Sequence, residues 1–487
     1  MGFVGGDSVK AIVIGAGIVG SLIARELTRY GFDVSMIEKE ADVGWGVTKA
    51  NSGIVHGGYD DEPGTLRAAL CAKGNAMYEE LSKELDFRVK RTGSFVVAFN
   101  DEELDTLKEL LKRGEINGVP GLKILDRDEA LSMEPHLNPE VKYALYAPTA
   151  GVIFPWDVAI AAVENATANG AKLFLNEKVV DIEVKNGKVR KVITDKGGHE
   201  ADVVVNAAGL YGDEIAKMAG AEHVPIHPRK GEYMILDNKV SKMVKRVIFP
   251  TPSKKSKGIL VVPTLTGEVL LGPTAQDLPP EMKDNLSTTA EGLNFVKEKV
   301  IKLMPNLPFN KTLKTFAGLR PESPQKDFFI KKSDKVWGFV NVIAIRSPGL
   351  TAAPAIAKYV VEKVIEEDMG ITLEKNESFN PIRKGITHFA DLPPEEWNEI
   401  IKKDPKAGKI ICFCNKVTER EVIEAIKRGA RTLDGIKFRT RAMAGRCQAN
   451  FCTTRVMRVL ARELGVDMSE IMLKSGNSWV VDGKVRR

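Results

Sequence analysis

A glycine-rich turn near the N-terminus constrains the fold more strongly than any other feature of this chain of 487 residues. A short apolar run of β type, Ala11–Ile14, leads into the sequence GAGIVG at Gly15–Gly20. A helical pattern of apolar residues follows over residues 21–31, and a second apolar run, Val34–Ile37, ends on Glu38. A strand, a tight turn, a helix, a second strand and an acid in this order predict a unit that binds a dinucleotide.

Each part of this unit has a physical role. Gly15 allows the tight turn, Gly17 lets the backbone approach a pyrophosphate, and Gly20 lets the helix pack on the strand. The phosphate would lie on the N-terminus of the helix, and the Glu38 carboxylate would accept hydrogen bonds from the adenosine ribose. The predicted cofactor contacts of this unit are Gly15, Gly17, Ile18, Val19, Gly20 and Glu38.

The next segment distinguishes between two nucleotide cofactors. Residues 46–58, GVTKANSGIVHGG, are mostly small or carry hydroxyl groups, so their backbone can approach an extended cofactor and its ring system. A nicotinamide-dependent dehydrogenase would continue its alternation of strands and helices at this point. The segment therefore favours FAD over NAD.

With ANSGIVH at residues 50–56, the chain resembles the FAD-dependent family of D-amino-acid oxidase, which includes glycerol-3-phosphate oxidases and dehydrogenases and L-2-hydroxyglutarate dehydrogenases. Further matching segments follow in the family's order through most of residues 10–365: GVIFP (151–155), DVVVNAAG (202–209), PRKGEY (228–233), LLGPTAQD (270–277), FAGLRPES (316–323) and SPGLTAAPAIAKYV (347–360). The resemblance implies FAD contacts at Thr48, Asn51, Ser52, Gly53, Val179, Gly209, Gly349, Leu350 and Thr351. The helix that begins at Gly349 would point its N-terminus at the flavin and favour negative charge on the ring.

The fold class expected from these matches is α/β, or mixed α+β overall. We expect a discontinuous, Rossmann-like FAD-binding domain of D-amino-acid-oxidase type from residues 1–90, 148–222 and 318–372. Residues 91–147 and 223–317 would form a substrate domain with an antiparallel sheet, since several of their segments alternate apolar and polar residues. Residues 373–405 are predicted to be a linker, and residues 406–487 a small helical iron–sulfur domain with a C-terminal tail.

Oxidation of a secondary alcohol by a flavin requires a base for the hydroxyl proton, and histidine is suited to this near neutral pH. Of six histidines, only His56 lies in the flavin loop, and the resemblance makes it the proton acceptor. The alternative is that His56 only hydrogen-bonds to the ring or packs beneath it. The other histidines are expected to be surface or packing residues: His136, His199, His223, His227 and His388.

A charged substrate needs a cationic anchor. Arg320 lies in the GLRP segment where the family binds its anion, and a guanidinium can bind phosphate or carboxylate through two parallel hydrogen bonds. By resemblance, Lys257, Ser52 and Ser347 are further substrate contacts, and Arg346 is an additional candidate cation. The alternative for each is a solvated charge or a helix cap.

Four of the five cysteines fall near the C-terminus in the pattern CxC, 32 residues, CxxxxC. Cysteines clustered in a chain without a recognisable export signal indicate metal binding rather than disulfides. Four thiolates suit a [2Fe-2S] cluster, whereas zinc sites usually use CxxC pairs, so the spacing favours iron–sulfur and leaves zinc as the alternative. The segment resembles the bacterioferritin-associated-ferredoxin-like domain. The predicted ligands are Cys412, Cys414, Cys447 and Cys452, while Cys71 is expected to be a buried packing residue.

The charge of the chain is divided unevenly. Residues 406–462 hold 14 Lys and Arg against 4 Asp and Glu, whereas the remainder holds 57 basic and 61 acidic residues. The basic module would offset the charge of the cluster and offer a docking surface to an acidic redox partner. Nucleic acid is not expected as a partner because no aromatic interleaving or known motif accompanies the charge. Without a spanning segment or a signal peptide, the chain is expected to be soluble and cytoplasmic, with peripheral membrane association left open.

The leading interpretation is an FAD-dependent oxidation of sn-glycerol 3-phosphate to dihydroxyacetone phosphate, with electrons passed through FAD and the [2Fe-2S] cluster to a partner or another acceptor. A second interpretation makes the substrate L-2-hydroxyglutarate or another 2-hydroxy acid, because Arg320 suits carboxylate as well as phosphate. A third is a non-catalytic redox or iron-handling protein, which His56 in the flavin loop disfavours, because a pure carrier needs no substrate base.

Overall fold

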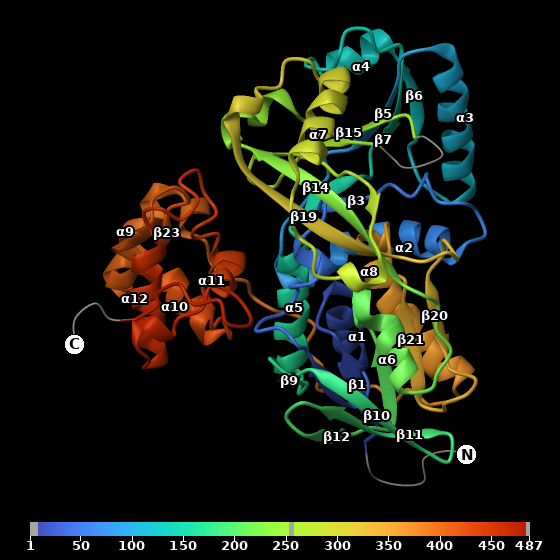
Figure 1. Ribbon diagram of the computed structural model, residues 1–487. Helices are drawn as coiled ribbons and strands as arrows, with labels where there is room; N and C mark the ends of the chain where they lie inside the picture. Colours follow the sequence, from blue (N-terminus) through green and yellow to red (C-terminus); the bar gives the residue numbers. More distant parts are fainter. Residues whose placement is uncertain (1–7, 253–257, 484–487) are drawn as a thin grey trace.

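The computed structural model describes residues 8–252 and 258–483 (Figure 1). A six-stranded sheet lies at the centre of the lower part of the molecule, in the order β20-β21-β13-β1-β2-β9. Its strands are parallel except for β20, which runs antiparallel to β21. The strands are β1 (Lys10–Ile14), β2 (Asp33–Ile37), β9 (Lys172–Phe174), β13 (Val203–Asn206), β20 (Phe329–Lys332) and β21 (Phe339–Ile343).

Both faces of this sheet are buried, as expected where parallel strands are covered on two sides. Ala11 and Val13 of β1 belong to a hydrophobic cluster with the helices α1 (Ile18–Thr28), α5 (Pro155–Ala168) and α8 (Gly349–Lys358). Ile12 and Ile14 belong to a second cluster, which includes residues of α6 (Gly212–Met218) and of the small antiparallel sheet β10-β11-β12. The strands of that small sheet are Val179–Lys185, Lys188–Thr194 and Gly198–Glu200.

A larger sheet of nine strands forms the upper part, in the order β18-β14-β17-β16-β15-β5-β7-β6, with β19 paired to β14. The bounds are β5 (Ser94–Ala98), β6 (Lys123–Asp126), β7 (Tyr143–Ala147), β14 (His227–Leu236), β15 (Val247–Pro250), β16 (Leu260–Pro263), β17 (Val269–Gly272), β18 (Gln276–Asp277) and β19 (Thr312–Glu322). The expectation of a purely antiparallel sheet was wrong in one place, because β15 pairs with β5 in parallel. These two strands come from different chain segments that meet side by side, so no hairpin fixes their direction.

Helices cover both faces of the nine-stranded sheet. The helix α7 (Ala290–Leu303) packs on one face, and α3 (Asp101–Ile116) packs on the other. The helix α4 (Arg127–Met133) caps the far end (Figure 1). Between the two layers lie α2 (Leu66–Leu85) and a three-stranded sheet of β3 (Ile54–Val55), β8 (Gly151–Ile153) and β4 (Val89–Lys90).

After α8 the helix continues as a π-helical segment, Tyr359–Asp368. Residues 370–388 then follow the surface of the lower layer, where Gly31 N donates to Glu374 O at 2.9 Å and the Arg383 guanidinium pairs with Glu164 at 2.7 Å. The segment interpreted as a linker also contains a helix, α9 (Pro394–Lys403).

The C-terminal module has a core of its own and lies beside the lower layer, with α11 next to α5 (Figure 1). It consists of β22 (Ile410–Cys412), β23 (Val417–Thr418), α10 (Glu419–Lys427), α11 (Leu433–Thr440) and α12 (Thr453–Leu464). A capping box formed by Thr418 and Glu421 opens α10. The helix α12 begins directly after Cys452. No helix in the described part of the chain is long and apolar enough to cross a membrane.

Candidate functional site

A cavity of about 1890 Å³ lies between the parallel sheet and the nine-stranded sheet. It is lined by almost every described residue that the sequence marked as a cofactor or substrate contact: Gly15, Gly17, Ile18, Val19, Gly20, Glu38, Thr48, Asn51, Ser52, Gly53, His56, Val179, Gly209, Arg320, Ser347, Gly349 and Leu350. Thr351 does not line it, and Lys257 lies outside the described residues. Segments more than 300 residues apart in the chain thus line the same cavity.

The three glycines of the first turn serve different purposes. Gly15 has φ +98°, and a Cβ on it would lie 2.6 Å from the carbonyl oxygen of Ala207. A Cβ on Gly20 would lie 2.0 Å from the carbonyl oxygen of Gly15, so the fold itself requires both glycines. At Gly17 a Cβ would meet only Thr48 Oγ1, at 3.3 Å. The backbone at Gly17 therefore stays open for the close approach of a ligand, as a pyrophosphate requires.

Glu38 closes β2 at the edge of the cavity. Its Oε2 accepts a hydrogen bond from Ala16 N at 2.8 Å, and its Oε1 accepts one from Glu40 N at 3.0 Å. Burial raises the pKa of this carboxyl, and the two backbone donors oppose that shift. The carboxyl is thereby held at the position from which a cofactor ribose is bound in this type of unit.

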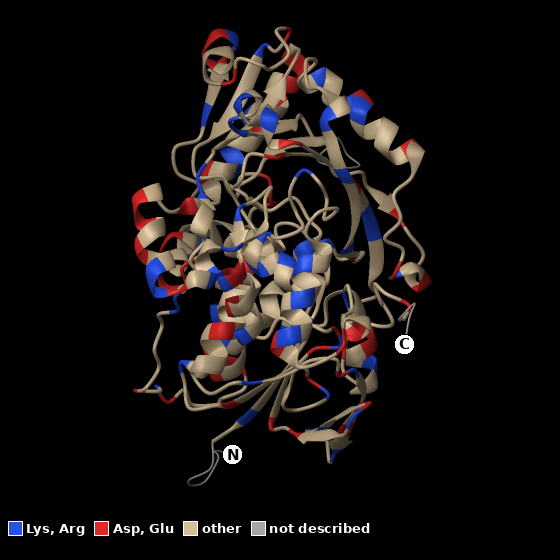
Figure 2. Ribbon diagram, turned by 90° about the vertical axis from the view of Figure 1, so that its left-hand side faces the viewer, with Lys and Arg blue, Asp and Glu red and all other residues tan. Residues whose placement is uncertain are grey.

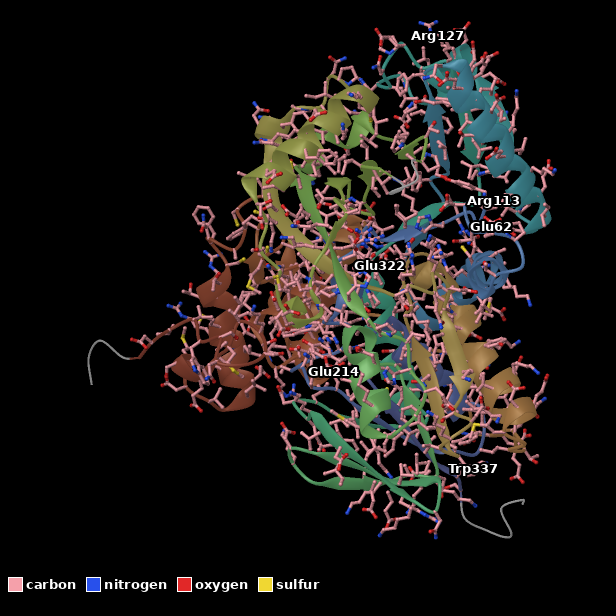
Figure 3. All side chains as sticks on the ribbon, turned by 45° about the vertical axis from the view of Figure 1, so that its right-hand side comes forward. Glu62, Arg113, Arg127, Glu214, Glu322 and Trp337 are labelled. Atoms are coloured by element: carbon pink, nitrogen blue, oxygen red, sulfur yellow. The ribbon has the colours of Figure 1, made fainter. Side chains whose placement is uncertain are left out.

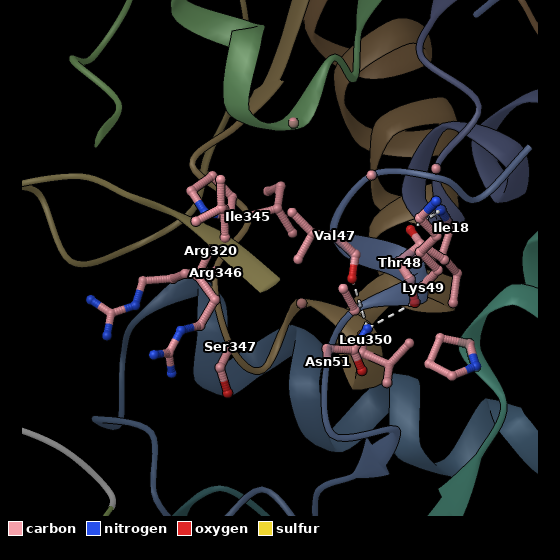
Figure 4. A pocket seen from close by; sticks show the side chains of 18 of the residues that line it. Ile18, Val47, Thr48, Lys49, Asn51, Arg320, Ile345, Arg346, Ser347 and Leu350 are labelled. Carbon is pink, nitrogen blue, oxygen red and sulfur yellow. Dashed lines mark hydrogen bonds between the residues drawn. The ribbon is translucent and has the colours of Figure 1, made fainter. Parts of the chain in front are cut away.

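The loop at residues 47–53 is fixed by its own side chains (Figure 4). Asn51 Nδ2 donates to the carbonyl oxygens of Val47 at 3.0 Å and Thr48 at 2.9 Å, and Asn51 Oδ1 accepts from Gly53 N at 2.8 Å. Thr48 Oγ1 accepts from Ile18 N at 3.0 Å, which ties the loop to the first turn of α1. The loop thus presents a rigid backbone edge to the cavity.

His56 follows β3 and lines the cavity. Its backbone N donates to Thr351 Oγ1 at 2.8 Å, and its carbonyl oxygen accepts from Asn75 Nδ2 at 2.7 Å. Its ring lies 5.9 Å from the ring of Phe249. Thr351 is fully buried in the first turn of α8 and holds the backbone of His56 in place, a role that the sequence did not indicate.

Arginine side chains gather at the substrate end of the cavity. Arg320 of β19 lies opposite Arg229 of β14 in the strand register, and its Nη2 donates to the carbonyl oxygen of Thr274 at 2.9 Å. Arg346, in the loop after β21, forms an ion pair with Glu322 at 2.8 Å and lies next to Ser347. Figure 4 shows the guanidinium groups of Arg320 and Arg346 turned the same way.

Sequence reasoning missed several residues that line this end of the cavity: Arg67, His227, Arg229, Tyr233 and Glu322. His227, which was expected to be a surface or packing residue, lies 3.3 Å from Asp277. Tyr233 OH lies 3.5 Å from Ser52 Oγ, and its ring stacks on Phe316 at 4.6 Å. These residues could have been found by pairing the segments PRKGEY and FAGLRPES as adjacent strands, because such strands would bring their polar residues together.

In the C-terminal module the four predicted cysteines lie as two pairs of neighbouring thiols, Cys412 with Cys452 and Cys414 with Cys447. The Cys452 thiol, together with the backbone amides of Asn415, Met443 and Cys414, lowers the pKa of Cys412 to about 6 against the effect of burial. Two thiolates for each iron are what an all-cysteine [2Fe-2S] cluster uses.

The loops around these cysteines are shaped for close approach of a ligand. Met443, Gln448 and Ala449 have positive φ, and a Cβ on Gly445 would lie 2.4 Å from the Cβ of Cys414. Among the described residues, no three His, Cys, Asp or Glu side chains are grouped around a single metal position. The fit to a cluster therefore rests on the chemistry of the donor set, four free cysteines in two neighbouring pairs.

Part of the basic charge of the module faces the remaining chain. Four arginines of the module bind carboxylates of the remaining chain, which we call the body (residues 8–372): Arg428 with Glu164 at 3.0 Å, Arg441 with Glu268 at 3.0 Å, Arg446 with Asp237 at 2.6 Å, and Arg439 with Asp42. Viewed from the side of the module, basic and acidic residues are interspersed over its helices (Figure 2). Four of the 14 basic residues of the module thus face the body, and the docking surface for an acidic redox partner stays a prediction.

The module also forms part of the cavity wall. Lys437, Phe438 and Arg441 of its α11 region line the cavity, as do Ala444 and Gln448 beside Cys447. The ring of Phe438 lies 5.1 Å from that of Trp156, which in turn stacks on Phe154 at 4.8 Å. The loop that carries Cys447 therefore borders the predicted flavin cavity directly.

Two family models match the chain: residues 10–363 match the model described as FAD dependent oxidoreductase, and residues 410–462 match the BFD-like [2Fe-2S] binding domain. These matches confirm the predicted FAD and [2Fe-2S] cofactors and the predicted fold class.

Known proteins resemble the chain over most of its length. It is 48% identical over 476 residues to glycerol 3-phosphate dehydrogenase of Caloramator mitchellensis, which covers 97% of this chain and 98% of the relative. It is 28% identical to the mitochondrial L-2-hydroxyglutarate dehydrogenase of Arabidopsis thaliana, over 74% of this chain and 84% of the relative. Among solved structures, the dithionite-reduced L-alpha-glycerophosphate oxidase from Mycoplasma pneumoniae with FAD bound aligns with a TM-score of 0.73 at 28% identity, over 78% of this chain and 99% of that chain.

Proposed function

Because the chain belongs to the FAD dependent oxidoreductase family and ends in a BFD-like [2Fe-2S] binding domain, we propose that it oxidises sn-glycerol 3-phosphate to dihydroxyacetone phosphate. The observation that carries this proposal is that His56 of the flavin loop and the arginines around Arg320 line one cavity. A base for a hydroxyl proton and an anchor for an anion are thereby available to one small substrate.

Each of these residues has a separate role in the proposed reaction. Arg320 and Ser347 bind the phosphate, with Lys257 as a further cation, and Ser52 contacts the polar carbon chain of the substrate. His56 accepts the proton of the secondary hydroxyl, and its backbone hydrogen bonds to Thr351 and Asn75 fix where the ring stands. When bound, the flavin supplies the hydride acceptor, and the cluster supplies one-electron steps.

The cofactor contacts in this proposal are those that line the cavity, from Gly15 and Glu38 to Gly349 and Leu350. Thr351 acts through His56 rather than on the flavin. The FAD-binding domain would comprise residues 1–90, 148–222 and 318–372, the substrate domain residues 91–147 and 223–317, the linker residues 373–405, and the iron–sulfur domain residues 406–487. The ligands of the cluster would be Cys412, Cys414, Cys447 and Cys452.

Electrons would leave through the cysteine module to a redox partner protein or another acceptor. Phe413 and Phe451 flank the cysteines and are 63% and 73% exposed, so a partner could approach the cluster closely there. We place the reaction in the cytoplasm, where thiols remain reduced and available for a cluster. Oxidation of L-2-hydroxyglutarate is the second candidate, favoured by the relative from Arabidopsis thaliana and by the affinity of Arg320 for any anion.

The test is anaerobic reduction of the flavin in the purified holoenzyme by each substrate in turn. We expect sn-glycerol 3-phosphate to bleach the flavin absorption far faster than L-2-hydroxyglutarate. Arg320→Ala should raise the Michaelis constant roughly 10- to 100-fold, since hydrogen bonds to charged groups contribute about 1.5–3 kcal/mol. Arg127→Ala, which removes an exposed arginine from α4, is the matched control. Faster bleaching by the 2-hydroxy acid would overturn the assignment of the substrate.

A further inference from the structure

Four guanidinium groups line the substrate end of the cavity, and three of them already have a carboxylate partner. Arg67 pairs with Asp61 at 2.6 Å, Arg229 binds Asp277 through two hydrogen bonds at 2.6 and 2.9 Å, and Arg346 pairs with Glu322 at 2.8 Å. Within residues 8–252 and 258–483, Arg320 has no carboxylate partner. Arg320 is therefore the one of these four arginines whose charge no carboxylate of the described residues offsets.

Arg346 is the arginine that is placed to offer further N–H donors beside Arg320. Glu322 lies 2.8 Å from Nη1 of Arg346, and the buried Nε of Arg346 has no hydrogen-bond partner in the described part of the chain. The same holds for Nε of Arg320. Both residues line the cavity, and their guanidinium groups face the same way beside Ser347 (Figure 4).

The surroundings of Arg346 also favour an anion. Burial lowers the pKa of Arg346, Glu322 opposes this shift, and the positive charges of Arg67, Arg229 and Arg320 add to it. The side chain is only 21% exposed, so solvent screens these repulsions incompletely. Crowded cations that are partly removed from water gain most from a ligand with two negative charges.

We propose that Arg346 is a second anion anchor which, together with Arg320, makes the site selective for a dianionic phosphate monoester over a monoanionic group of the same shape. Glu322 holds Arg346 in position from β19, so that the remaining donors of the guanidinium face the ligand. This inference rests on the proposed function and specifies how the site distinguishes its substrate from 2-hydroxy acids, whose distal group is a carboxylate.

The competing role for Arg346 is structural. Its ion pair with Glu322 ties the loop after β21 to the end of β19, and the loop leads directly into α8. A purely structural tie would affect ligands of any charge to the same degree, whereas an anchor for the second charge would affect a dianion more than a monoanion.

The experiment compares two isosteric substrates on the holoenzyme at pH 8, sn-glycerol 3-phosphate and sn-glycerol 3-sulfate. At this pH the phosphate monoester carries nearly two negative charges, because its second pKa is about 6, while the sulfate ester carries one. Flavin reduction gives kcat and KM for each ester. In Arg346→Gln we expect the KM for the phosphate to rise roughly 10- to 100-fold, the KM for the sulfate to change far less, and kcat to stay nearly constant.

Two further variants sharpen the comparison. Arg346→Lys keeps the charge and the pair with Glu322 but lacks the planar fork, so it should lose part of the selectivity while folding normally. Arg113→Gln is the matched control. Arg113 also lines the cavity and pairs with a glutamate, Glu62, at 3.4 Å, but Figure 3 shows this pair near the edge of the molecule, well apart from Glu322. Its loss should leave the ratio of the two esters unchanged.

Equal losses for both esters in Arg346→Gln, or unchanged selectivity in a folded variant, would overturn the inference. If Arg346→Gln fails to fold, undiminished selectivity in Arg346→Lys overturns it equally. A wild-type enzyme that reduces its flavin with sn-glycerol 3-phosphate but shows no preference over the sulfate refutes only the inference. A wild-type enzyme that is inactive with the phosphate and active with L-2-hydroxyglutarate refutes the proposed function together with it.

Discussion

The body and the C-terminal module build their sites in opposite ways. The cavity of the body gathers residues from Gly15 to Leu350, and it is enclosed between two layers of sheet. The module gathers its four cysteines from residues 412–452, and Cys414 is exposed to solvent. A deep site suits hydride transfer, which benefits from the exclusion of water, whereas a shallow site suits the exchange of single electrons with a partner.

The same contrast applies to how the two parts depend on each other. The core of the module consists of its own residues with a few from adjoining segments, so the cysteine loops can form without the cavity. The cavity, in contrast, takes part of its wall from the module, through Lys437, Phe438 and Arg441. Substitutions in the module at its interface should therefore affect the cavity of the body, whereas substitutions at the cysteines alone should not.

The largest expected effect comes from removing two thiolates. The double variant Cys412→Ser/Cys414→Ser should lose the cluster completely, because it leaves one thiolate on each predicted iron position. Iron and acid-labile sulfide analysis measures this loss. Because the cysteines lie outside the substrate end of the cavity, flavin reduction by substrate should remain intact while turnover with the physiological acceptor collapses.

Cys71→Ala serves as the control for this double variant, since Cys71 is fully buried on α2 and should not affect the iron content. Loss of flavin reduction in the double variant would show that the two parts are not separable. Intact turnover with the acceptor would show that the cluster is structural and that electrons leave by another route.

The next largest effect concerns the body. His56→Ala should lower the rate of flavin reduction about 10²- to 10⁴-fold, the range expected for loss of a general base, with a smaller effect on substrate affinity. Stopped-flow absorbance of the flavin measures the rate. His227→Ala removes another histidine of the cavity wall and should have a much smaller effect. A His56 variant with an unimpaired rate would assign the proton to another group.

Features determined by neighbouring residues in the chain were predictable from the sequence. The turn at Gly15–Gly20 and the acid Glu38 at the end of β2 depend on short spacings. Arg229 and Glu322 were not predicted, because they reach the cavity only through the register of β14 with β19. Strand register depends on pairing between distant segments, which a single sequence shows weakly.

The ion pairs between the module and the body were not predicted, for a related reason. Counting charges showed a basic module and a slightly acidic body but not that they face each other. Arg439 and Asp42 are only 5% and 2% exposed, and the two side chains meet through paired hydrogen bonds. Composition shows the sign of the net charge of a module, but the groups with which its charged side chains pair depend on the three-dimensional structure.

A third prediction tests this interface. Arg439→Met should leave Asp42 buried without a partner and lower the free energy of unfolding by about 3–5 kcal/mol. Thermal unfolding monitored by circular dichroism and limited proteolysis of the module measure the effect. Asp42→Asn should cost a similar amount, and the double variant Asp42→Leu/Arg439→Met should be more stable than either single variant, because no buried charge remains. Additive losses in the double variant would mean that the pair contributes nothing specific to docking.

The smallest effect is a pH dependence at the same interface. Lys314 of β19 faces Lys437 of α11, with Asp434 and Lys49 nearby, and the positive charge of Lys437 is the main cause that lowers the pKa of Lys314 to about 8. The unfolded chain keeps the ordinary value near 10.5, so between pH 8 and 10.5 the unfolded state holds more protons and stability rises with pH.

Below pH 8 the full penalty of two facing lysines is present. Lys314→Gln should therefore raise stability at pH 7 by about 0.2–1 kcal/mol, a small value because solvent reaches the exposed side chain and screens the repulsion, and the gain should fade as the pH approaches 10. Melting temperatures measured at both pH values test this, with Lys311→Gln, an exposed lysine just before the same strand, as the control. A gain that is equal at pH 7 and pH 10 would show that repulsion across the interface is not its source, and that the module and the body meet at this point without electrostatic strain.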